Sequence, residues 1–476
     1  MDYKDLPAQE VFHWFKEINQ IPRGSGDEKR ISDFLYNWAK ERNLDVWQDE
    51  ALNIVIHKGA TKGYENAPKV ILQGHMDMVC EKGLDSDHDF SKDPIEMIVD
   101  GDYLRANDTT LGADDGIAVA MALAVLDADD IEHPAIEVIF TTAEETSMVG
   151  ALNLTNEHLS GDYLFNIDSE EEGIFLSSSS GGVNSESKFK VEYKDNDKKA
   201  LEITLKGFTG GHSGMEIIKQ RANAIKVLAR LLNECNCDKL KLVSIEGGTK
   251  HNAIANVAKA TIVHTDYAKV KEAMNELFSH IKKDYHVEDP NMTLEFKEVK
   301  ADKRMTKKDT DRIINFLMLA PHGVIYMSKD IEGLVMTSCN AAILRTEGNS
   351  VNYLCSIRSS SDAALVEVRE QVRIMTEILD GKVELSEAYP SWEFDEDPVL
   401  RDLVSKVYKE ETGKDAEVSA IHAGLECGLL KQILPDTKMI SFGPNIYDVH
   451  TAREHLDIKS TERMWGFLKA LLKAVK

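Results

Sequence analysis

Carboxylates and histidines stand at the ends of several apolar segments of this 476-residue chain. Residues 70–80, VILQGHMDMVC, include His75 and Asp77 where the apolar run ends. Residues two apart on a strand point to the same face, so these two side chains are expected to lie together. The pair is compatible with a surface position, a structural hydrogen bond, or a metal ligand and the partner that orients it.

Further titratable residues occupy similar positions where apolar elements begin or end: Asp114 and Asp115 before GIAVAMALAVLDAD, Glu144 and Glu145 after IEVIFTT, Asp168 after YLFNI, and His450 after a Gly/Pro loop. Each alone is ordinary for a helix start, a turn or a surface histidine. Three of the positions, however, are consecutive strand ends, which share one edge of a parallel sheet. So many carboxylates at one edge would repel one another unless cations compensated for them.

The combination of imidazole and carboxylate donors suits Zn²⁺, Mn²⁺ or Co²⁺ better than Ca²⁺. The candidate ligands are His75, Asp114, Glu145, Asp168 and His450. If Asp114 bridges two cations, each receives about three protein ligands and keeps an open position for water. Glu144 is then free to act as general base, and Asp77 is expected to orient the imidazole of His75.

The elements that position these residues follow an α/β pattern in the first 180 residues, with helix-like and strand-like segments alternating. This pattern predicts a largely parallel sheet. SSSSGG (177–182) is interpreted as a flexible joint. Beyond it, a β-α-β-β-α-β order predicts an α+β, ferredoxin-like module. We therefore expect a catalytic metal-binding domain formed by 1–182 and 391–476, with a second domain, 183–390, inserted into it.

Composition limits the classes of partner. The net charge of −26 would repel phosphate backbones and anionic lipid, so neither nucleic acid nor a membrane is an expected partner. Six cysteines in a chain of this length do not form a disulfide framework. No basic leader followed by an apolar stretch and no run of about 18 apolar residues is present, so a cytoplasmic location is expected.

Six motifs carry a family resemblance: GHMDMV, LGADDGIAVA, TTAEETSMVGA, NIDSEEEG, KGFTGGHSG and HTAREHLDI. Over nearly its whole length the chain resembles the dinuclear metallopeptidases that include peptidase T, carnosinase-like dipeptidases, carboxypeptidase G and aminoacylase. TLGADDGIA, PHGVI, IHAGLECGL and AYPSW are similar to its subgroup of bacterial aminoacyl-histidine (Xaa-His) dipeptidases. The resemblance implies a parallel-sheet catalytic domain with an inserted lid, two Zn²⁺ ions (Co²⁺ or Mn²⁺ as substitutes), a homodimer, and hydrolysis of short peptides by a metal-bridging hydroxide.

The resemblance also implies residue roles. His75 and Asp168 would bind one metal, Glu145 and His450 the other, with Asp114 as the bridge, Glu144 as the catalytic base and Asp77 as the orienting carboxylate. In the lid, His212 of GGHSG would stabilise the oxyanion, commonly from across a dimer interface. Asn252 and Arg358 would bind the C-terminal carboxylate of the substrate, a task that suits the arginine fork.

The chain departs from the wider family in three places. Many relatives have Lys where this chain has Gly116, and the matched subgroup also lacks that Lys. Thr-Ala follows His450 in place of Ser-Pro, although Glu454 is retained. IHAGLECG replaces a GGTD segment, and its His422 and Glu426, at i and i+4, either shape the substrate site or support its ligands, or form a packed structural pair. The alternatives to a dipeptidase are an N-acyl amino acid amidohydrolase and an inactive metal-binding scaffold.

Overall fold

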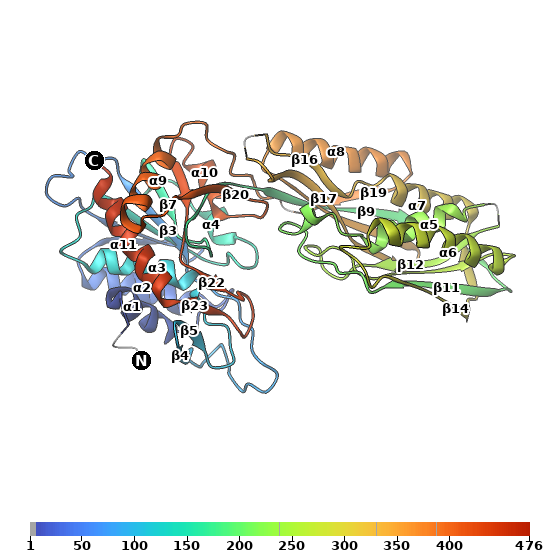
Figure 1. Ribbon diagram of the computed structural model, residues 1–476, viewed down its shortest axis with the longest axis horizontal. Helices are drawn as coiled ribbons and strands as arrows, with labels where there is room; N and C mark the ends of the chain where they lie inside the picture. The colour runs from blue at the N-terminus through green and yellow to red at the C-terminus, as the bar shows by residue number, and fades with distance from the viewer. Residues whose placement is uncertain (1–5, 238, 330, 387) are drawn as a thin grey trace. The chain divides into compact units, whose positions relative to one another are not determined.

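The computed structural model describes residues 6–237, 239–329, 331–386 and 388–476. The chain forms two compact units (Figure 1). The first comprises the chain up to Ser178 with Phe394–Ala420 and Leu425–Lys476, and the second comprises Ser179–Glu393 and Ile421–Gly424. These limits lie within four residues of the expected 182/183 and 390/391 boundaries, but the short return of the chain at 421–424 was not anticipated.

The first unit is built on an eight-stranded sheet with the order β1 (Asp45–Gln48), β2 (Ile54–Lys58), β6 (Ile136–Thr141), β3 (Val70–His75), β7 (Tyr163–Asn166), β21 (Lys438–Ser441), β8 (Ile174–Ser179) and β20 (Glu417–Ile421). The central strands β6, β3, β7 and β21 are parallel, whereas β1, β2 and β8 pair antiparallel. The sheet is therefore mixed, with the predicted parallel arrangement at its centre. Every residue of β3 and β6 is buried, as expected of strands covered on both faces.

Seven helices occur among the described residues of this unit: α1 (Gln9–Asn19), α2 (Lys29–Glu41), α3 (Ala113–Asp127), α4 (Val149–Asn153), α9 (Val399–Thr412), α10 (Glu426–Ile433) and α11 (Ile458–Ala474). Helix α3 is apolar on nearly all sides and is buried between β3 and α1, which is where such a helix is stable. A small sheet has the order β22 (Ile446–Tyr447), β23 (His455–Asp457), β5 (Tyr103–Ala106) and β4 (Met97–Asp100).

The second unit has its own core and a nine-stranded sheet. The order is β14 (Thr293–Lys300), β11 (Lys199–Lys206), β13 (Ala258–Val263), β12 (Lys241–Gly247), β17 (Val335–Glu347), β18 (Ser350–Ser359), β9 (Gly181–Lys190) and β19 (Lys382–Leu385), and β16 (Gly323–Met327) also pairs with β17. A separate pair joins β10 (Tyr193–Asp195) to β15 (Lys303–Met305). The order β14-β11-β13-β12 is that of a ferredoxin-like module, and β17, β18, β9 and β19 extend it.

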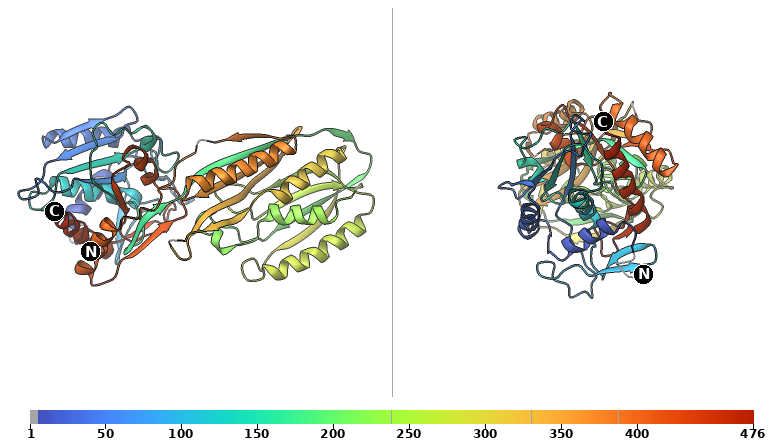
Figure 2. Two further views of the ribbon diagram at one scale, coloured as in Figure 1. Left: turned by 90° about the horizontal axis from the view of Figure 1, so that it is seen from above. Right: turned by 90° about the vertical axis from the view of Figure 1, so that its left-hand side faces the viewer.

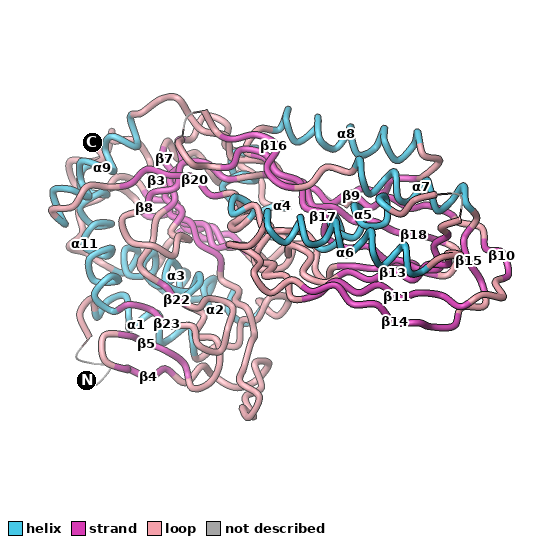
Figure 3. The backbone as a smooth tube through the Cα atoms, turned by 45° about the vertical axis from the view of Figure 1, so that its right-hand side comes forward, coloured by secondary structure: helices cyan, strands magenta, loops and turns pink. Residues whose placement is uncertain are grey.

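Helices α5 (Ala224–Glu234), α6 (Tyr267–Asp284), α7 (Lys307–Leu319) and α8 (Asp362–Ile378) belong to the same unit, with the short 3₁₀ helix η2 at Ile217–Lys219. The four α-helices lie side by side over one face of the sheet (Figure 2, left). The strands of that sheet form a layer next to the helices (Figure 3). Helix α5 packs against α6, α7 and β13, and α8 packs against β9 and β18.

The segment SSSSGG was interpreted as a flexible joint, and the boundary between the two units does fall inside it, between Ser178 and Ser179, but the segment is mostly strand and not loop. It forms the end of β8 and the start of β9, and the serines at 177–180 are buried. A Cβ atom on Gly181 would lie 2.6 Å from the backbone nitrogen of Ser391, and one on Gly182 would lie 2.5 Å from the hydroxyl of Tyr389. The small residues are needed because residues 389–391 cross closely over the strand.

The six cysteines are free, as the sequence predicted. None of the helices in the described ranges combines the length and the hydropathy that a membrane crossing requires.

Candidate active site

The carboxyl ends of the parallel strands bring the predicted ligands of the first unit together. His75 is the last residue of β3, Glu144 and Glu145 follow β6, and Asp168 follows β7. Asp114 comes from the first turn of α3, and His450 from the loop between β22 and β23. The backbone at His450 is left-handed, with φ of 60°, an uncommon conformation for a non-glycine residue that is often found at functional sites.

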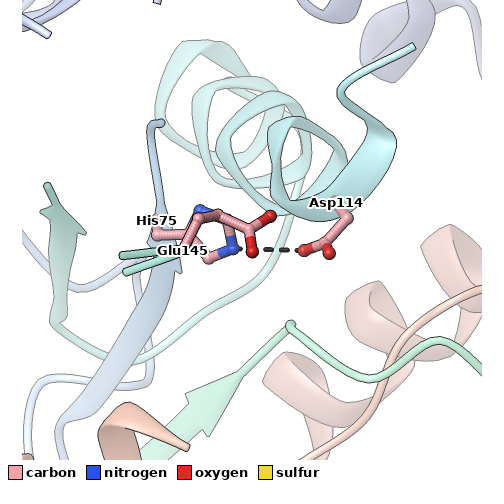
Figure 4. Close-up of side chains that lie close together, drawn as sticks. All are labelled: His75, Asp114 and Glu145. Atoms are coloured by element: carbon pink, nitrogen blue, oxygen red, sulfur yellow. Dashed lines mark hydrogen bonds and ion pairs between the residues drawn. The ribbon is translucent and has the colours of Figure 1, made fainter. Parts of the chain in front are cut away.

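Asp114 lies between the two histidines. Its Oδ1 is 3.1 Å from Nε2 of His75, an interaction drawn in Figure 4, and its Oδ2 is 3.1 Å from Nε2 of His450. Each carboxylate oxygen therefore faces a different imidazole. This is the arrangement that a bridging ligand between two cations needs.

The other carboxylates divide between the two histidines. Glu145 Oε2 is 2.9 Å from Nε2 of His450. Asp168 Oδ1 is 3.6 Å, and Glu144 Oε2 3.9 Å, from Nε2 of His75. Ligand atoms of His75, Asp114 and Glu145 all lie within 4.8 Å of one another. The nitrogen and oxygen donors present thus fit divalent transition-metal ions.

Asp77 is fully buried and holds both the histidine and the loop after β6. Its Oδ1 is 3.4 Å from Nδ1 of His75, which directs Nε2 of that ring toward the cluster. The backbone N–H groups of Glu144 and Glu145 donate to the same carboxylate at 3.1 and 3.4 Å, and the hydroxyl of Ser25 donates to it at 2.7 Å. Asp77 therefore holds a candidate ligand, His75, and the backbone of the candidate base, Glu144, at once.

The concentration of charge changes the pKa values of the cluster. Burial lowers the pKa of His75, but hydrogen bonds to Asp114 and Asp77 raise it well above its usual value overall. Hydrogen bonds to Asp114 and Glu145 raise the pKa of His450 to about 11. Burial raises the pKa of Glu144 well above normal. Divalent cations would take the place of the protons that this set of carboxylates otherwise retains on the histidines.

Sequence reasoning gave no ligand role to Asp115, although the structure places it in a second group of potential ligands with His75 and Asp168. Its Oδ2 accepts the backbone N–H of His75 at 3.2 Å, and burial raises its pKa well above normal. The only feature of the sequence that could have indicated a ligand role for Asp115 is its position directly after Asp114. Buried Arg23 was also missed, and Glu454 was noted only as a retained family residue.

The predicted substrate residues His212, Asn252 and Arg358 belong to the second unit. Nδ1 of His212 accepts the N–H groups of Gly214 and Met215 at 3.3 and 3.1 Å, which leaves the ring proton on Nε2. Burial, followed by the charge of Arg358, lowers the pKa of His212, so the ring is a neutral donor. The side chain of Arg358 donates to the hydroxyl of Tyr389 at 2.8 Å. Asn252 accepts the N–H of Ser213 through its backbone oxygen at 2.8 Å.

His422 and Glu426 do not share a helix face, because α10 begins at Glu426 and His422 precedes it. His422 belongs to the second unit, where its Nε2 lies 2.7 Å from the hydroxyl of Ser338. Glu426 is buried in the first unit and accepts hydrogen bonds from Gln73 and Thr141, both at 2.6 Å. The two side chains therefore have different hydrogen-bond partners. Glu426 contacts β3 through Gln73 and β6 through Thr141, the two strands whose ends carry His75 and lead to Glu144 and Glu145.

An α/β sheet that gathers two histidines and several carboxylates at its carboxyl edge is the arrangement of a metal-dependent hydrolase. Residues 71–474 match Peptidase family M20/M25/M40, and the chain belongs to that family. The family resemblance and the enzyme class predicted from the sequence, a metallopeptidase, are thereby confirmed.

Two relatives are similar over the full length. The chain is 37% identical over 480 residues to the cytosol non-specific dipeptidase of Escherichia coli K12, covering 100% of this chain and 99% of that protein. The aminoacylhistidine dipeptidase of Vibrio alginolyticus superposes with a TM-score of 0.92 at 36% identity, covering 100% of this chain and 98% of the other. A tripeptidase from Staphylococcus aureus, at 18% identity and a TM-score of 0.57 over 99% of both chains, shares the fold.

Proposed function

We propose that this protein is a dinuclear zinc dipeptidase that hydrolyses Xaa-His and related dipeptides, including β-Ala-His. One observation supports this proposal most directly: the two carboxylate oxygens of Asp114 lie 3.1 Å from the imidazoles of two different histidines. The full-length similarity to the dipeptidases of Escherichia coli and Vibrio alginolyticus supports the same activity. Co²⁺ or Mn²⁺ are expected to substitute for zinc.

Two cations held by His75, Asp114, Asp168, Glu145 and His450 would polarise the scissile carbonyl and make the attacking water more acidic. Glu144 accepts the proton of that water and returns it to the leaving amine. Its buried position keeps the carboxyl group basic enough for this exchange. Asp77 keeps the imidazole of His75 in one tautomer and orientation.

The second unit would contribute substrate recognition. His212 donates its Nε2–H to the developing oxyanion, and Arg358 and Asn252 bind the free carboxylate of the substrate. A carboxylate held at a fixed distance from the scissile bond restricts the enzyme to very short peptides. We assign His422 to shaping this substrate site. We also propose that the protein is a cytoplasmic homodimer, the location agreeing with the name of the Escherichia coli relative.

Matched substrates test this function. Purified protein is assayed with Ala-His, Ala-Ala, β-Ala-His, N-acetyl-His and Ala-histidinamide, before and after chelation and after zinc is restored. We expect rapid hydrolysis of Ala-His and β-Ala-His that is lost on chelation and recovered with zinc. Ala-histidinamide, which lacks the free carboxylate, should be a poor substrate.

Each alternative gives a different result. Faster hydrolysis of N-acetyl-His than of Ala-His would assign the site to N-acyl amino acids. Bound metal with no hydrolysis of any of these substrates would indicate an inactive scaffold. Activity that persists in fully metal-free protein would overturn the mechanism.

A further inference from the structure

We propose that Arg23 and Glu454 are positioning residues that hold the loop Leu111–Asp114 from two sides and so fix the carboxylate of Asp114 between the histidines. We call this pair the Arg23–Glu454 clamp. The inference rests on the proposed function, because it concerns the same cluster. Both charged side chains are only 2% exposed, a position that is costly unless their hydrogen bonds are made inside the protein.

Glu454 acts on the N-terminus of α3. Its Oε2 accepts the N–H groups of Leu111 and Gly112 at 2.8 and 3.0 Å, and its Oε1 accepts that of Ala113 at 2.7 Å. The first N–H groups of a helix have no partner within it, and Gly112, at the N-cap, has no side chain to supply one. Glu454 provides this cap from the far end of the sequence, and its negative charge suits the helix dipole.

Arg23 holds the other side of the same loop. Its guanidinium donates to the backbone oxygens of Gly112 (2.6 Å), Met76 (3.1 Å) and Asp77 (3.1 Å) and to the side chain of Asn19 (3.1 Å). Nδ1 of His75 lies 3.2 Å from the same oxygen of Asp77. One guanidinium therefore joins the end of β3, which carries His75, to the loop that carries Asp114.

Two glycines make room for this guanidinium. A Cβ atom on Gly116 would lie 2.5 Å from Nη2 of Arg23, and one on Gly112 would lie 2.4 Å from the same atom. Gly116 is inside α3, where alanine is otherwise the more stable residue. Arg23 is thus the closest neighbour that a side chain at position 116 would meet; the next residue is Phe15, whose Cε2 would lie 3.1 Å from that Cβ.

The charges of the clamp also complement each other. Burial lowers the pKa of Arg23, and the charge of Glu454, followed by those of Asp77 and Asp115, opposes this shift. Glu454 follows His450 by four residues, so its attachment to the loop also restricts the segment that supplies the second histidine. Loss of either clamp residue should therefore loosen Asp114 relative to both histidines and weaken metal binding.

The test measures metal binding directly. Co²⁺ and Zn²⁺ affinities, stoichiometry and the Co²⁺ absorption spectrum are recorded for the full-length wild type, Arg23→Ala, Arg23→Lys, Glu454→Gln, Gly116→Ala and the double variant Arg23→Ala with Gly116→Ala. We expect Arg23→Ala and Glu454→Gln to lower metal affinity by roughly 10–100-fold, the range for residues that orient ligands. Arg23→Lys should recover part of this loss. The exposed Arg30→Ala is the control and should bind metal normally.

Gly116→Ala gives a result that a general structural role would not. In the wild type it should lower metal affinity and the melting temperature. In Arg23→Ala, where the closest remaining neighbour is Cε2 of Phe15 at 3.1 Å, it should lower both by much less. The same effect in both backgrounds, or wild-type affinity in Arg23→Ala and Glu454→Gln, would overturn the proposal. If Arg23→Ala does not fold, Glu454→Gln and Arg23→Lys carry the test. Wild-type protein that binds two metals but hydrolyses no dipeptide would contradict the proposed function and leave the clamp intact.

Discussion

At the scale of single residues, Glu144 is distinguished from its neighbour Glu145 by what it faces. Glu145 contacts His450 at 2.9 Å, whereas Glu144 lies 3.9 Å from His75, close enough to the cluster to exchange a proton with water there. Glu144→Gln should therefore lower kcat by about 10²–10⁴-fold, the usual contribution of a general base. Metal content, measured by elemental analysis, should stay at the wild-type value.

The exposed Glu157→Gln serves as the control for this prediction and should keep full activity. Loss of metal together with activity in Glu144→Gln would mean that Glu144 is a ligand and not the base.

The two adjacent aspartates allow a second comparison. Asp114 faces both histidines, whereas Asp115 accepts the backbone N–H of His75. Asp114→Asn should weaken metal binding by more than the roughly 10–100-fold typical of a supporting residue, and Asp115→Asn should stay within that range or below it. Titration calorimetry with Zn²⁺ measures both. Equal losses would place Asp115 among the ligands.

At the scale of elements, the sequence predicted those candidate site residues that stand at or just after the end of an apolar strand. The strand that ends in His75 and the strands that come shortly before Glu145 and Asp168 are visible in the sequence because their apolar runs stop at polar residues. Arg23 and Glu454 were not given their role because most of their partners are backbone groups, up to 89 residues away for Arg23 and up to 343 residues away for Glu454. Backbone groups leave no mark in a sequence. The pairing of His422 with Glu426 failed because the spacing i, i+4 was read without knowing where α10 begins.

The N-cap of α5 is an element whose contribution can be measured. The side chain of Asn223 accepts the N–H groups of Ile225 and Lys226 at 2.9 and 3.3 Å and donates to the backbone oxygen of Ala341 at 2.8 Å. Asn223→Ala should lower the free energy of unfolding of the second unit by about 1–2 kcal/mol. Urea denaturation measures the change. Asp266→Ala, which removes from the N-terminus of α6 a cap that accepts the N–H of Lys269 at 3.2 Å, should have a smaller effect.

The attachment of α11 to the turn before β8 predicts a pH dependence. Burial would raise the pKa of Glu172, but hydrogen bonds from Arg463, at 2.7 and 2.5 Å, and from Ser460 lower it below its usual 4.5 overall. A carboxylate with a depressed pKa in the folded state stabilises the protein above its unfolded-state pKa, and this stabilisation is lost as the pH falls through the folded-state value.

Glu172→Gln should therefore lower the free energy of unfolding by about 1 kcal/mol at pH 7, a modest value because Arg463 is partly exposed. The difference from wild type should shrink as the pH falls below 4.5. Denaturation curves at several pH values measure it. A difference that stays constant down to pH 3 would show that the ion pair is not its cause.

At the scale of the whole molecule, the candidate metal ligands and the proposed substrate-binding residues belong to different units, each with its own hydrophobic core. Every candidate metal ligand lies in the first unit, and the residues assigned to the substrate carboxylate and oxyanion lie in the second. A ligand that binds only the folded state stabilises the unit that holds it, by about 2.7 kcal/mol for one site at 100 times the dissociation constant. The two units should therefore respond separately to changes made in only one of them.

Calorimetry of the full chain tests this separation. Chelation should lower the melting temperature of the first unit by roughly 5–10 °C per site and leave the second unit unchanged. Asn223→Ala should do the reverse, lowering only the transition of the second unit. Asn223→Ala after chelation should show both shifts at once. Restored zinc should then reverse only the shift of the first unit. A single transition that moves as one under both treatments would show that the units unfold together, and that metal bound in one stabilises the other.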